Sequence, residues 1–348
     1  MNWRRISNEY YNLTGTLGKY KPKPSILCKR KVPMKPLIIL TGPTSVGKTK
    51  LSIELAKAVN GEIISADSMQ VYKTMDIGTA KIQPDEMEGV KHYLIDEFTP
   101  EVEFNVVKFQ TLAKQYMEEI YQQGKIPILV GGTGFYIQSI IKDVDFSENE
   151  EEDNYRQELE SLAKEYGATY LHHKLQEVDP ESADAIHENN VKKVIRALEY
   201  YYQTGRKISE HNKEQSQRQS PYNYVYFVLN DHRDKLYTNI ERRIDLMLEE
   251  GLLKEVKSLK EMGYSKDLVS MQGLGYKEIL AYLNGECSLE EAIYVLKRDT
   301  RHFAKRQLTW FKREDQVTWI HKPDFEYNTG KMLEYMIAIL KESGILKS

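Results

Sequence analysis

The chain has 348 residues with a formal net charge of −3, and its 41% hydrophobic content is enough to bury a large core and to form more than one module. Cys28 and Cys287 are the only cysteines, which argues against a disulfide framework or a thiolate metal site and fits a reducing cytoplasm. No apolar run approaches the roughly 20 residues that span a bilayer, and the small net charge means that a polyanionic partner must be bound by a local basic patch.

The first 33 residues have the composition of a basic extension rather than of a folded unit. They carry eight Lys or Arg residues against a single acid, Glu9, and they show neither helical nor strand periodicity. We therefore expect residues 1–33 to be a disordered basic extension. A basic arm for RNA is one interpretation; the favoured one is that the folded protein really begins at Met34, and an organelle transit peptide ranks below both.

From residue 34 to residue 144, apolar runs of strand length alternate with helical stretches. This alternation predicts an α/β fold in which helices cover both faces of a parallel sheet. The predicted elements are strand 37–41, helix 48–59, strand 62–65, strand 92–95, helix 106–122, strand 126–130 and a short helix that follows.

The segment between the first strand and the first helix is the most informative part of the chain. It reads Gly42, Pro43, Thr44, Ser45, Val46, Gly47, Lys48 and Thr49, which fits the pattern of a phosphate-binding loop. In such a loop, backbone N–H groups surround phosphate oxygens at a helix N-terminus, the lysine adds a positive charge and the threonine hydroxyl can ligate Mg²⁺. The sequence therefore predicts a P-loop NTPase-like core that binds a diphosphate with Mg²⁺, but the loop alone does not name the ligand.

An acid and hydrogen-bonding side chains follow the next strand. Asp67, Ser68, Met69 and Gln70 come just after strand 62–65, and ligands of open α/β sheets bind at that edge. Asp67 could act as a Mg²⁺ ligand, as a general base or only as a helix cap. Gln70 offers both a donor and an acceptor, which suits reading the edge of a base.

A glycine-rich turn, Gly131 to Gly134, follows strand 126–130 and places Thr133 at the same edge. Glycine pairs also serve simple turns, so this motif alone is weak evidence. The strand ends without the acidic residue that holds Mg²⁺ in a hydrolysing NTPase. Asp96 and Asp231 end other apolar runs and could replace it.

After residue 144 the pattern becomes almost entirely helical to residue 203, which predicts an inserted helical domain at residues 145–215. Strand 224–229, a helix near 234–250 and a short strand 317–320 then return to the sheet, so residues 216–325 form the second part of the core. Residues 326–348 are expected to be a C-terminal helix or tail.

Two basic clusters are candidates for binding RNA. Lys192, Lys193 and Arg196 lie within about one helical turn, and residues 297–313 carry seven basic residues against one acid. Solvated helix faces look similar, but aromatic rings interleaved with arginine favour stacking on unpaired bases. For Trp310, core packing and base stacking remain equally open.

Taken in order, these segments resemble the tRNA dimethylallyltransferase (tRNA isopentenyltransferase) family from about Met34 to Trp319. The resemblance rests on the phosphate loop and on seven further motifs: Ser65–Tyr72, Asp76–Lys81, His92–Asp96, Gly131–Tyr136, Arg196–Glu199, Gly275–Lys277 and Lys305–Trp310. It implies transfer of a dimethylallyl group from dimethylallyl diphosphate to N6 of the adenosine 3′-adjacent to the anticodon of tRNA, with release of diphosphate.

The resemblance also implies residue roles. The catalytic group would be Asp67, Lys48, Thr49 and Arg243, with Thr49 on Mg²⁺ and with Arg243 joining residues 42–49 on the diphosphate. The implied tRNA contacts are Asp67, Ser68, Met69, Gln70, Thr133, Lys192, Lys193, Val194, Ile195, Arg196, Gln272, Gly275, Tyr276, Lys277, Lys305, Arg306, Gln307, Trp310 and Lys312. We expect a cytoplasmic monomer that does not act at a membrane.

Three other functions compete with this interpretation. A small-molecule kinase would use the same loop with ATP, and an isopentenyltransferase acting on free adenine nucleotides would share the first half of the chain. An RNA-binding module with a vestigial loop is disfavoured by the intact Lys48, Thr49 and Asp67. The extended basic and aromatic C-terminal region favours tRNA over free nucleotides.

Overall fold

The computed structural model describes residues 34–146 and 154–347, so the extension predicted at residues 1–33 lies outside the described residues. The strands are β1 (Lys35–Thr41), β2 (Gly61–Ala66), β3 (His92–Tyr93), β4 (Ile126–Gly131), β5 (Tyr222–Asn230) and β6 (Val317–His321). The α-helices are α1 (Lys48–Val59), α2 (Val106–Gln122), α3 (Gly134–Ile141), α4 (Tyr155–Tyr166), α5 (Ala168–Val178), α6 (Pro180–Ala185), α7 (Val191–Thr204), α8 (Ile208–Gln217), α9 (Arg233–Glu250), α10 (Leu252–Glu261), α11 (Tyr276–Leu283), α12 (Leu289–Phe311) and α13 (Thr329–Glu342). Two short 3₁₀ helices are η2 (Ser270–Gln272) and η3 (Lys322–Phe325).

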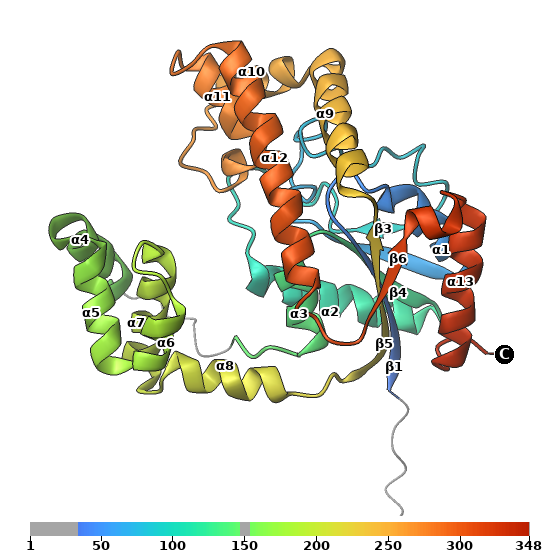
Figure 1. Cartoon of the computed structure of the whole chain (residues 1–348), viewed down its shortest axis with the longest axis horizontal. Helices are drawn as coiled ribbons and strands as arrows, with labels where there is room; N and C mark the ends of the chain where they lie inside the picture. Colours follow the sequence, from blue (N-terminus) through green and yellow to red (C-terminus); the bar gives the residue numbers. More distant parts are fainter. Residues whose placement is uncertain (1–33, 147–153, 348) are drawn as a thin grey trace, which may run out of the picture. The chain divides into compact units, whose positions relative to one another are not determined.

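The strands of the described residues form one sheet in the order β3-β2-β4-β1-β5-β6 (Figure 1). Every neighbouring pair is parallel, and β1 lies between β4 and β5. The register places Gly131 of β4 beside both Thr41 of β1 and Ala66 of β2. The carboxyl ends of these three strands therefore reach the same edge, where the segments that follow them come together.

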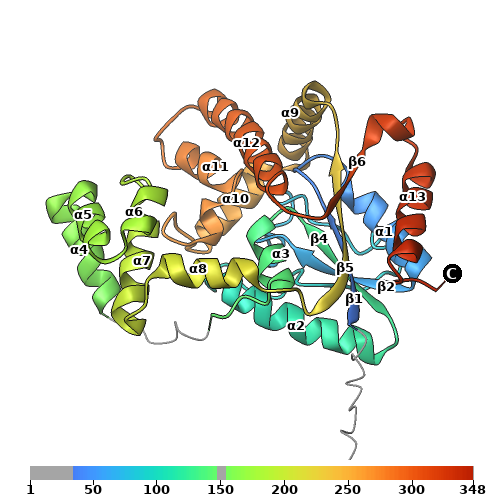
Figure 2. The same ribbon diagram turned by 60° about the horizontal axis from the view of Figure 1, so that its bottom comes forward.

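Helices cover both faces of the sheet. α1 and α13 lie on one side, and α2 and α3 lie on the other (Figures 1 and 2). Leu37, Ile38, Ile39 and Leu40 of β1 are fully buried, as expected for a parallel strand packed on both faces. No helix within residues 34–146 and 154–347 is long and apolar enough to cross a membrane.

The predicted fold class is confirmed, and each predicted strand of the sheet is present. One strand is shorter than predicted: β3 covers only His92–Tyr93 rather than residues 92–95. Leu94 and Asp96 adopt φ values of 60° and 55°, and this left-handed backbone ends the strand. The apolar pattern predicted burial of this segment correctly but could not show the turn.

Helices α4 to α8 lie between α3 and β5, in the part of the chain where the sequence predicts a helical insertion. They have a cluster of buried residues of their own, which includes Leu159, Leu171, Leu175, Val194, Ile195 and Leu198. The last of these helices, α8, ends at Gln217, two residues beyond the predicted limit of 215. Near the insertion's ends, Asp145 N donates to Gln215 Oε1 at 3.3 Å and Arg218 donates to the carbonyl oxygen of Asp143 at 2.8 Å.

Candidate active site

The loop after β1 turns sharply at the N-terminus of α1. Gly42 and Gly47 have φ values of 151° and 94°, a region in which L-residues are strained. A Cβ on Gly42 would also lie 2.4 Å from the carbonyl oxygen of Leu229, so glycine is required there. Lys48 Nζ donates to the carbonyl oxygens of Gly42 and Pro43, each at 2.9 Å, which folds the lysine back over the loop.

The loop holds polar groups suited to an anion. Burial lowers the pKa of Lys48 to about 8; the charge of Asp67 opposes this shift and that of Arg243 adds to it. Ser45 Oγ is buried without a hydrogen-bond partner in the described part of the chain. A phosphate group in the loop would accept hydrogen bonds from Ser45 and stabilise the charged lysine.

Asp67 follows β2 and has two distinct carboxylate oxygens. Its Oδ1 accepts hydrogen bonds from Met69 N at 2.8 Å and from Gln70 N at 3.3 Å, which stabilises the turn. Its Oδ2 has no hydrogen-bond partner among the described residues, and Asp67 lines both cavities described below. Asp67 can therefore cap the turn through Oδ1 and still act as a general base or a Mg²⁺ ligand through Oδ2.

The amide group of Gln70 is partly engaged within the protein, because its Nε2 donates to the carbonyl oxygens of Thr79 and Ala80 at 3.3 and 3.2 Å.

Each glycine of the turn Gly131–Gly134 leaves room for a neighbour. A Cβ on Gly131 would lie 2.2 Å from the carbonyl oxygen of Ala66. A Cβ on Gly132 would lie 2.2 Å from Nε2 of Gln307, and one on Gly134 would lie 2.2 Å from Cδ1 of Trp310. The motif thus has a packing explanation that its sequence alone did not provide. Thr133 lies at the N-terminus of α3 and lines the apolar cavity that is described below.

Gln307 connects two of these loops from helix α12. Its Oε1 accepts a hydrogen bond from Thr44 N at 2.9 Å, and its Nε2 donates to the carbonyl oxygen of Gly132 at 3.0 Å. The side chain is buried. The resemblance implies that Gln307 contacts tRNA; in the structure both ends of its amide are engaged inside the protein, where they tie the phosphate loop to the turn after β4.

Arg243 of α9 lies beside the phosphate loop, as predicted. Its NH1 donates to Thr44 Oγ1 at 3.2 Å and its NH2 donates to the carbonyl oxygen of Thr79 at 3.4 Å. Its Nε is buried and has no hydrogen-bond partner in the described residues. A partly buried guanidinium whose Nε–H is buried and unsatisfied, next to a phosphate loop, is suited to holding an anion.

Two cavities share a wall at this edge of the sheet. The first, of about 520 Å³, is lined by the loop residues Thr44 to Thr49 and by Arg242 and Arg243. The second, of about 420 Å³, has an apolar side formed by Met69, Ile240, Ile244, Met247, Leu274 and Leu296. Asp67, Thr79, Arg243 and Gln307 line both. The site therefore joins a polar phosphate cavity to an apolar cavity, with Asp67 at the junction.

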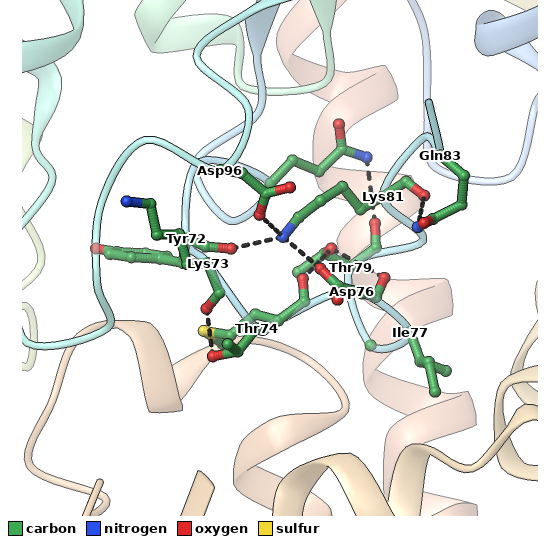
Figure 3. Close-up of polar contacts among 12 residues, drawn as sticks. Tyr72, Lys73, Thr74, Asp76, Ile77, Thr79, Lys81, Gln83 and Asp96 are labelled. Carbon is green, nitrogen blue, oxygen red and sulfur yellow. Dashed lines mark hydrogen bonds and ion pairs between the residues drawn. The ribbon is translucent and has the colours of Figure 1, made fainter. Parts of the chain in front are cut away.

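Asp96 and Asp231 do not replace the acid that is absent after β4. Lys81 is almost fully buried and its Nζ donates to Asp96, to Asp76 Oδ1 at 2.6 Å and to the carbonyl oxygen of Tyr72 at 2.6 Å (Figure 3). Asp231 is buried beside β5. Neither aspartate lines the phosphate cavity or its apolar neighbour.

The predicted contacts Gln272, Gly275, Tyr276 and Lys277 all line the apolar cavity. Tyr276 is fully buried, and its hydroxyl donates to Glu255 Oε1 at 2.7 Å. The same carboxylate accepts hydrogen bonds from three successive backbone N–H groups, those of residues 76, 77 and 78, at 2.8 to 3.1 Å. Tyr276 and Glu255 therefore hold the 76–81 loop against the site.

The C-terminal part of α12 presents basic side chains to solvent. Lys305, Arg306 and Lys312 are exposed. Trp310 is only partly exposed and packs edge-on against Phe135, with ring centroids 6.3 Å apart. Packing within the protein is thus an observed role for Trp310. Arg306 lies over the Phe303 ring, 5.8 Å from its centroid, and all three cations are exposed enough to meet a polyanion.

The basic segment of α7 is divided by its helical period. Lys192 and Lys193 are exposed and Arg196 is half-buried, whereas Val194 and Ile195 are 0% and 3% exposed in the core of the insertion. The side chains of Val194 and Ile195 are therefore not available to tRNA, although the resemblance included them. The exposed lysines remain suitable contacts.

The donor groups at the loop fit Mg²⁺. The Thr49 hydroxyl and the Asp67 carboxylate, both hard oxygen donors, line the phosphate cavity. No group of three or more His, Cys, Asp or Glu residues that could hold a metal ion occurs among the described residues. The rest of a Mg²⁺ coordination shell would have to come from phosphate oxygens and water, as is usual for this ion.

Several residues that line the phosphate cavity, among them Thr79 and Lys322, received no role from the sequence. Thr79 belongs to a motif that contributed to the resemblance, and its carbonyl oxygen accepts a hydrogen bond from Arg243. Lys322 directly follows β6. The rule that ligands bind at the carboxyl ends of parallel strands, if applied to this last strand, would have identified it.

The fold is that of an α/β protein of the phosphate-loop class, and the site combines groups suited to a phosphate with an apolar cavity. A family model described as IPP transferase matches residues 70–314. The chain belongs to this family, and the family resemblance noted from the motifs is confirmed.

Two curated relatives match most of the chain. The chain is 64% identical over 314 residues to the tRNA dimethylallyltransferase of Lachnoclostridium phytofermentans, covering 90% of this chain and 100% of the relative. It is 53% identical over 307 residues to the tRNA dimethylallyltransferase of Acetivibrio thermocellus, covering 88% and 98%.

Solved structures agree with this assignment. The full-length tRNA isopentenylpyrophosphate transferase of Bacillus halodurans is 46% identical, with a TM-score of 0.67 and coverage of 90% of this chain and 99% of that chain. A eukaryotic dimethylallyltransferase described as acting on tRNA is 32% identical, with a TM-score of 0.73 and coverage of 82% and 74%.

Proposed function

We propose that this protein transfers a dimethylallyl group from dimethylallyl diphosphate to N6 of the adenosine 3′-adjacent to the anticodon of tRNA, and releases diphosphate. Membership of the IPP transferase family makes it a prenyltransferase, and its relatives are tRNA-modifying enzymes. The observation that carries the finer proposal is the position of Asp67 between the phosphate cavity and the apolar cavity.

Asp67 is suited to accept the proton that the reaction releases. An exocyclic amine is a poor nucleophile because its lone pair is delocalised into the ring, so a nearby carboxylate helps the attack. In the proposed step, N6 bonds to C1 of the dimethylallyl group, the bond from C1 to the diphosphate oxygen breaks, and Oδ2 of Asp67 takes the N6 proton. Oδ1 stays in its two hydrogen bonds to the turn, which keeps the carboxylate oriented.

The leaving diphosphate requires positive charge and N–H donors. The amides of the phosphate loop, Lys48 and Arg243 supply them, and Ser45 adds a hydroxyl. Mg²⁺, held by Thr49 and by the diphosphate itself, would supply further charge neutralisation when bound.

The apolar cavity gives the allyl group a place from which water is excluded. An allyl cation-like carbon reacts readily with water, so its surroundings must be dry for transfer to compete with hydrolysis. Ile240, Ile244 and Met247 of α9 and Leu296 of α12 provide such a lining. The target adenosine must also leave its base stack to reach Asp67.

The basic side chains on α12 and α7 support binding of tRNA. Lys305 and Arg306 are exposed on α12 and Lys312 directly after it, and Lys192 and Lys193 are exposed on α7. Contacts of this kind to phosphates carry most of the affinity for a nucleic acid. We further propose that the protein acts as a monomer in the cytoplasm; the two widely spaced cysteines support the reducing compartment.

The test is incubation of the purified protein with dimethylallyl diphosphate, Mg²⁺ and unmodified tRNA, followed by nuclease digestion and mass spectrometry of the nucleosides. We expect a dimethylallyl adduct on adenosine that is absent when AMP replaces tRNA. Modification of AMP alone would establish a nucleotide-specific transferase instead. No adduct on either acceptor, together with ATP turnover on a small acceptor, would establish a kinase.

A further inference from the structure

Lys322 places a second lysine at the phosphate loop. It is the first residue of η3, directly after β6, and its side chain lines the phosphate cavity with Lys48 and Thr49. Its Nζ donates to the carbonyl oxygen of Val46 at 3.0 Å. A Cβ built on Gly47 would lie 3.5 Å from the same nitrogen. The ammonium group therefore lies beside the loop residues whose N–H groups begin α1.

The surroundings of Lys322 keep its charge close to the loop without neutralising it fully. Its side chain is 19% exposed, and its nearest carboxylate, Asp231 Oδ2, is 3.9 Å away, beyond hydrogen-bonding distance. Asp231 directs its other oxygen elsewhere, because Oδ1 accepts from His232 N at 2.8 Å and from the Tyr327 hydroxyl at 3.0 Å. The only hydrogen-bond acceptor recorded for Lys322 among the described residues is thus a neutral carbonyl oxygen.

Lys48 and Lys322 differ in what they can offer a ligand. Lys48 reaches over the loop and already donates to two carbonyl oxygens, at 2.9 Å each. Lys322 makes one such bond, and burial lowers its pKa while the charge of Asp231 opposes that shift. A phosphate oxygen is a far stronger partner for an ammonium group than a backbone carbonyl, because both groups are charged.

We propose that Lys322 binds the diphosphate group of the prenyl donor and of the released product. The inference rests on the proposed function for the identity of the prenyl donor. The groups at the site recognise the diphosphate alone, whatever organic group it carries. The lysine enters from the far end of the chain, after the last strand of the sheet, whereas the loop belongs to the first strand. Diphosphate binding would then hold the C-terminal segment against the loop by a charge-assisted hydrogen bond.

The test compares Lys322→Met with Lys235→Met and Lys322→Arg. Lys235 is exposed and its Nζ lies 3.4 Å from the centroid of the Tyr327 ring, but it does not line the phosphate cavity. Lys235→Met therefore removes one positive charge in the same region without changing the lining of the phosphate cavity. The measurements are the dissociation constant for inorganic diphosphate, the KM for dimethylallyl diphosphate and the dissociation constant for tRNA.

We expect Lys322→Met to weaken binding of inorganic diphosphate by about tenfold or more and to raise the KM for the donor similarly, as for loss of a hydrogen bond between charged groups. Lys322→Arg should restore much of the affinity, and Lys235→Met should leave all three constants near those of the unmodified protein. Unchanged affinity for inorganic diphosphate in Lys322→Met would overturn the proposal. So would a loss confined to tRNA affinity, which would make the ligand a backbone phosphate.

Loss of Lys322 could also disturb folding, because Asp231 is fully buried. The double variant Lys322→Met with Asp231→Asn removes both charges and keeps an oxygen that can accept the two Oδ1 hydrogen bonds. It should fold and should still bind inorganic diphosphate about tenfold more weakly. Wild-type affinity in this double variant would likewise refute the role. Binding of inorganic diphosphate needs no tRNA, so these results stand whether or not the prenyl transfer is observed.

Discussion

Replacing Asp67 by asparagine is the sharpest test of the proposed chemistry. The side chain has one oxygen engaged in the turn and one facing the cavities, so an amide can keep the first role and lose the second. Asparagine presents a carbonyl oxygen to Met69 N and Gln70 N, but it cannot accept a proton at neutral pH. Alanine removes both roles and serves as the comparison.

The structure allows the two effects to be separated in size. Loss of proton transfer is expected to slow the chemical step by about 10²–10⁴ in both variants. Loss of the hydrogen bonds of 2.8 and 3.3 Å should cost Asp67→Ala about 1–2 kcal/mol in the free energy of unfolding. Asp67→Asn should lose less than about half of that, because it retains both acceptor contacts.

The assay is single-turnover prenyl transfer with enzyme in excess over unmodified tRNA, paired with chemical denaturation of each variant and a tRNA binding measurement. We expect tRNA affinity close to that of the unmodified protein in both variants, since one carboxylate among many contacts contributes little to it. A single-turnover rate for Asp67→Asn within about tenfold of the unmodified enzyme would refute the base role. A slow step in Asp67→Ala alone would instead assign the effect to the turn.

Gln307→Met keeps the length of the side chain but removes its hydrogen bonds to Thr44 and Gly132. Chemical denaturation should show a loss of about 1–3 kcal/mol in the free energy of unfolding, and binding of dimethylallyl diphosphate should weaken. Unaltered binding would contradict the bridging role of Gln307. Because the pKa of Lys48 is about 8 and a bound anion favours its charged form, affinity for inorganic diphosphate, followed by calorimetry, should fall as the pH rises through about 8. Lys48→Arg should lack that step, and an identical pH profile would exclude Lys48 as its source. Glu255→Ala loses four accepted hydrogen bonds and should lower the free energy of unfolding by about 2–4 kcal/mol. A change below about 1 kcal/mol would show that other contacts hold the 76–81 loop.

Contiguous patterns made part of the site predictable. The loop from Gly42 to Thr49 is a single segment between a strand and a helix, so sequence alone places its backbone. The strand-end rule brought Asp67 and Thr133 to the same edge, and the sheet register confirms that position. Arg243, by contrast, lies in an ordinary amphipathic helix and was found only through the family resemblance.

The rest depends on contacts between distant segments. Gln307 and Thr44 are 263 positions apart, and nothing in either neighbourhood reveals the hydrogen bond between them. The resemblance takes whole segments as tRNA contacts without regard to helical period, so it includes Ile195 although this side chain is buried in the core of the insertion. The period of the helix could have separated the buried members of such segments from the exposed ones.

The place of β5 in the sheet governs the order in which the protein can assemble on the ribosome. β1 is made early, but its neighbour β5 begins at Tyr222, after the whole of the helical insertion. Until then one edge of β1 has no partner, and an apolar strand with a free edge can pair with other chains. Helices α4 to α7 share a buried cluster of their own and can pack earlier. Fragments that end before Tyr222 keep this edge of β1 unpaired, and we expect them to aggregate.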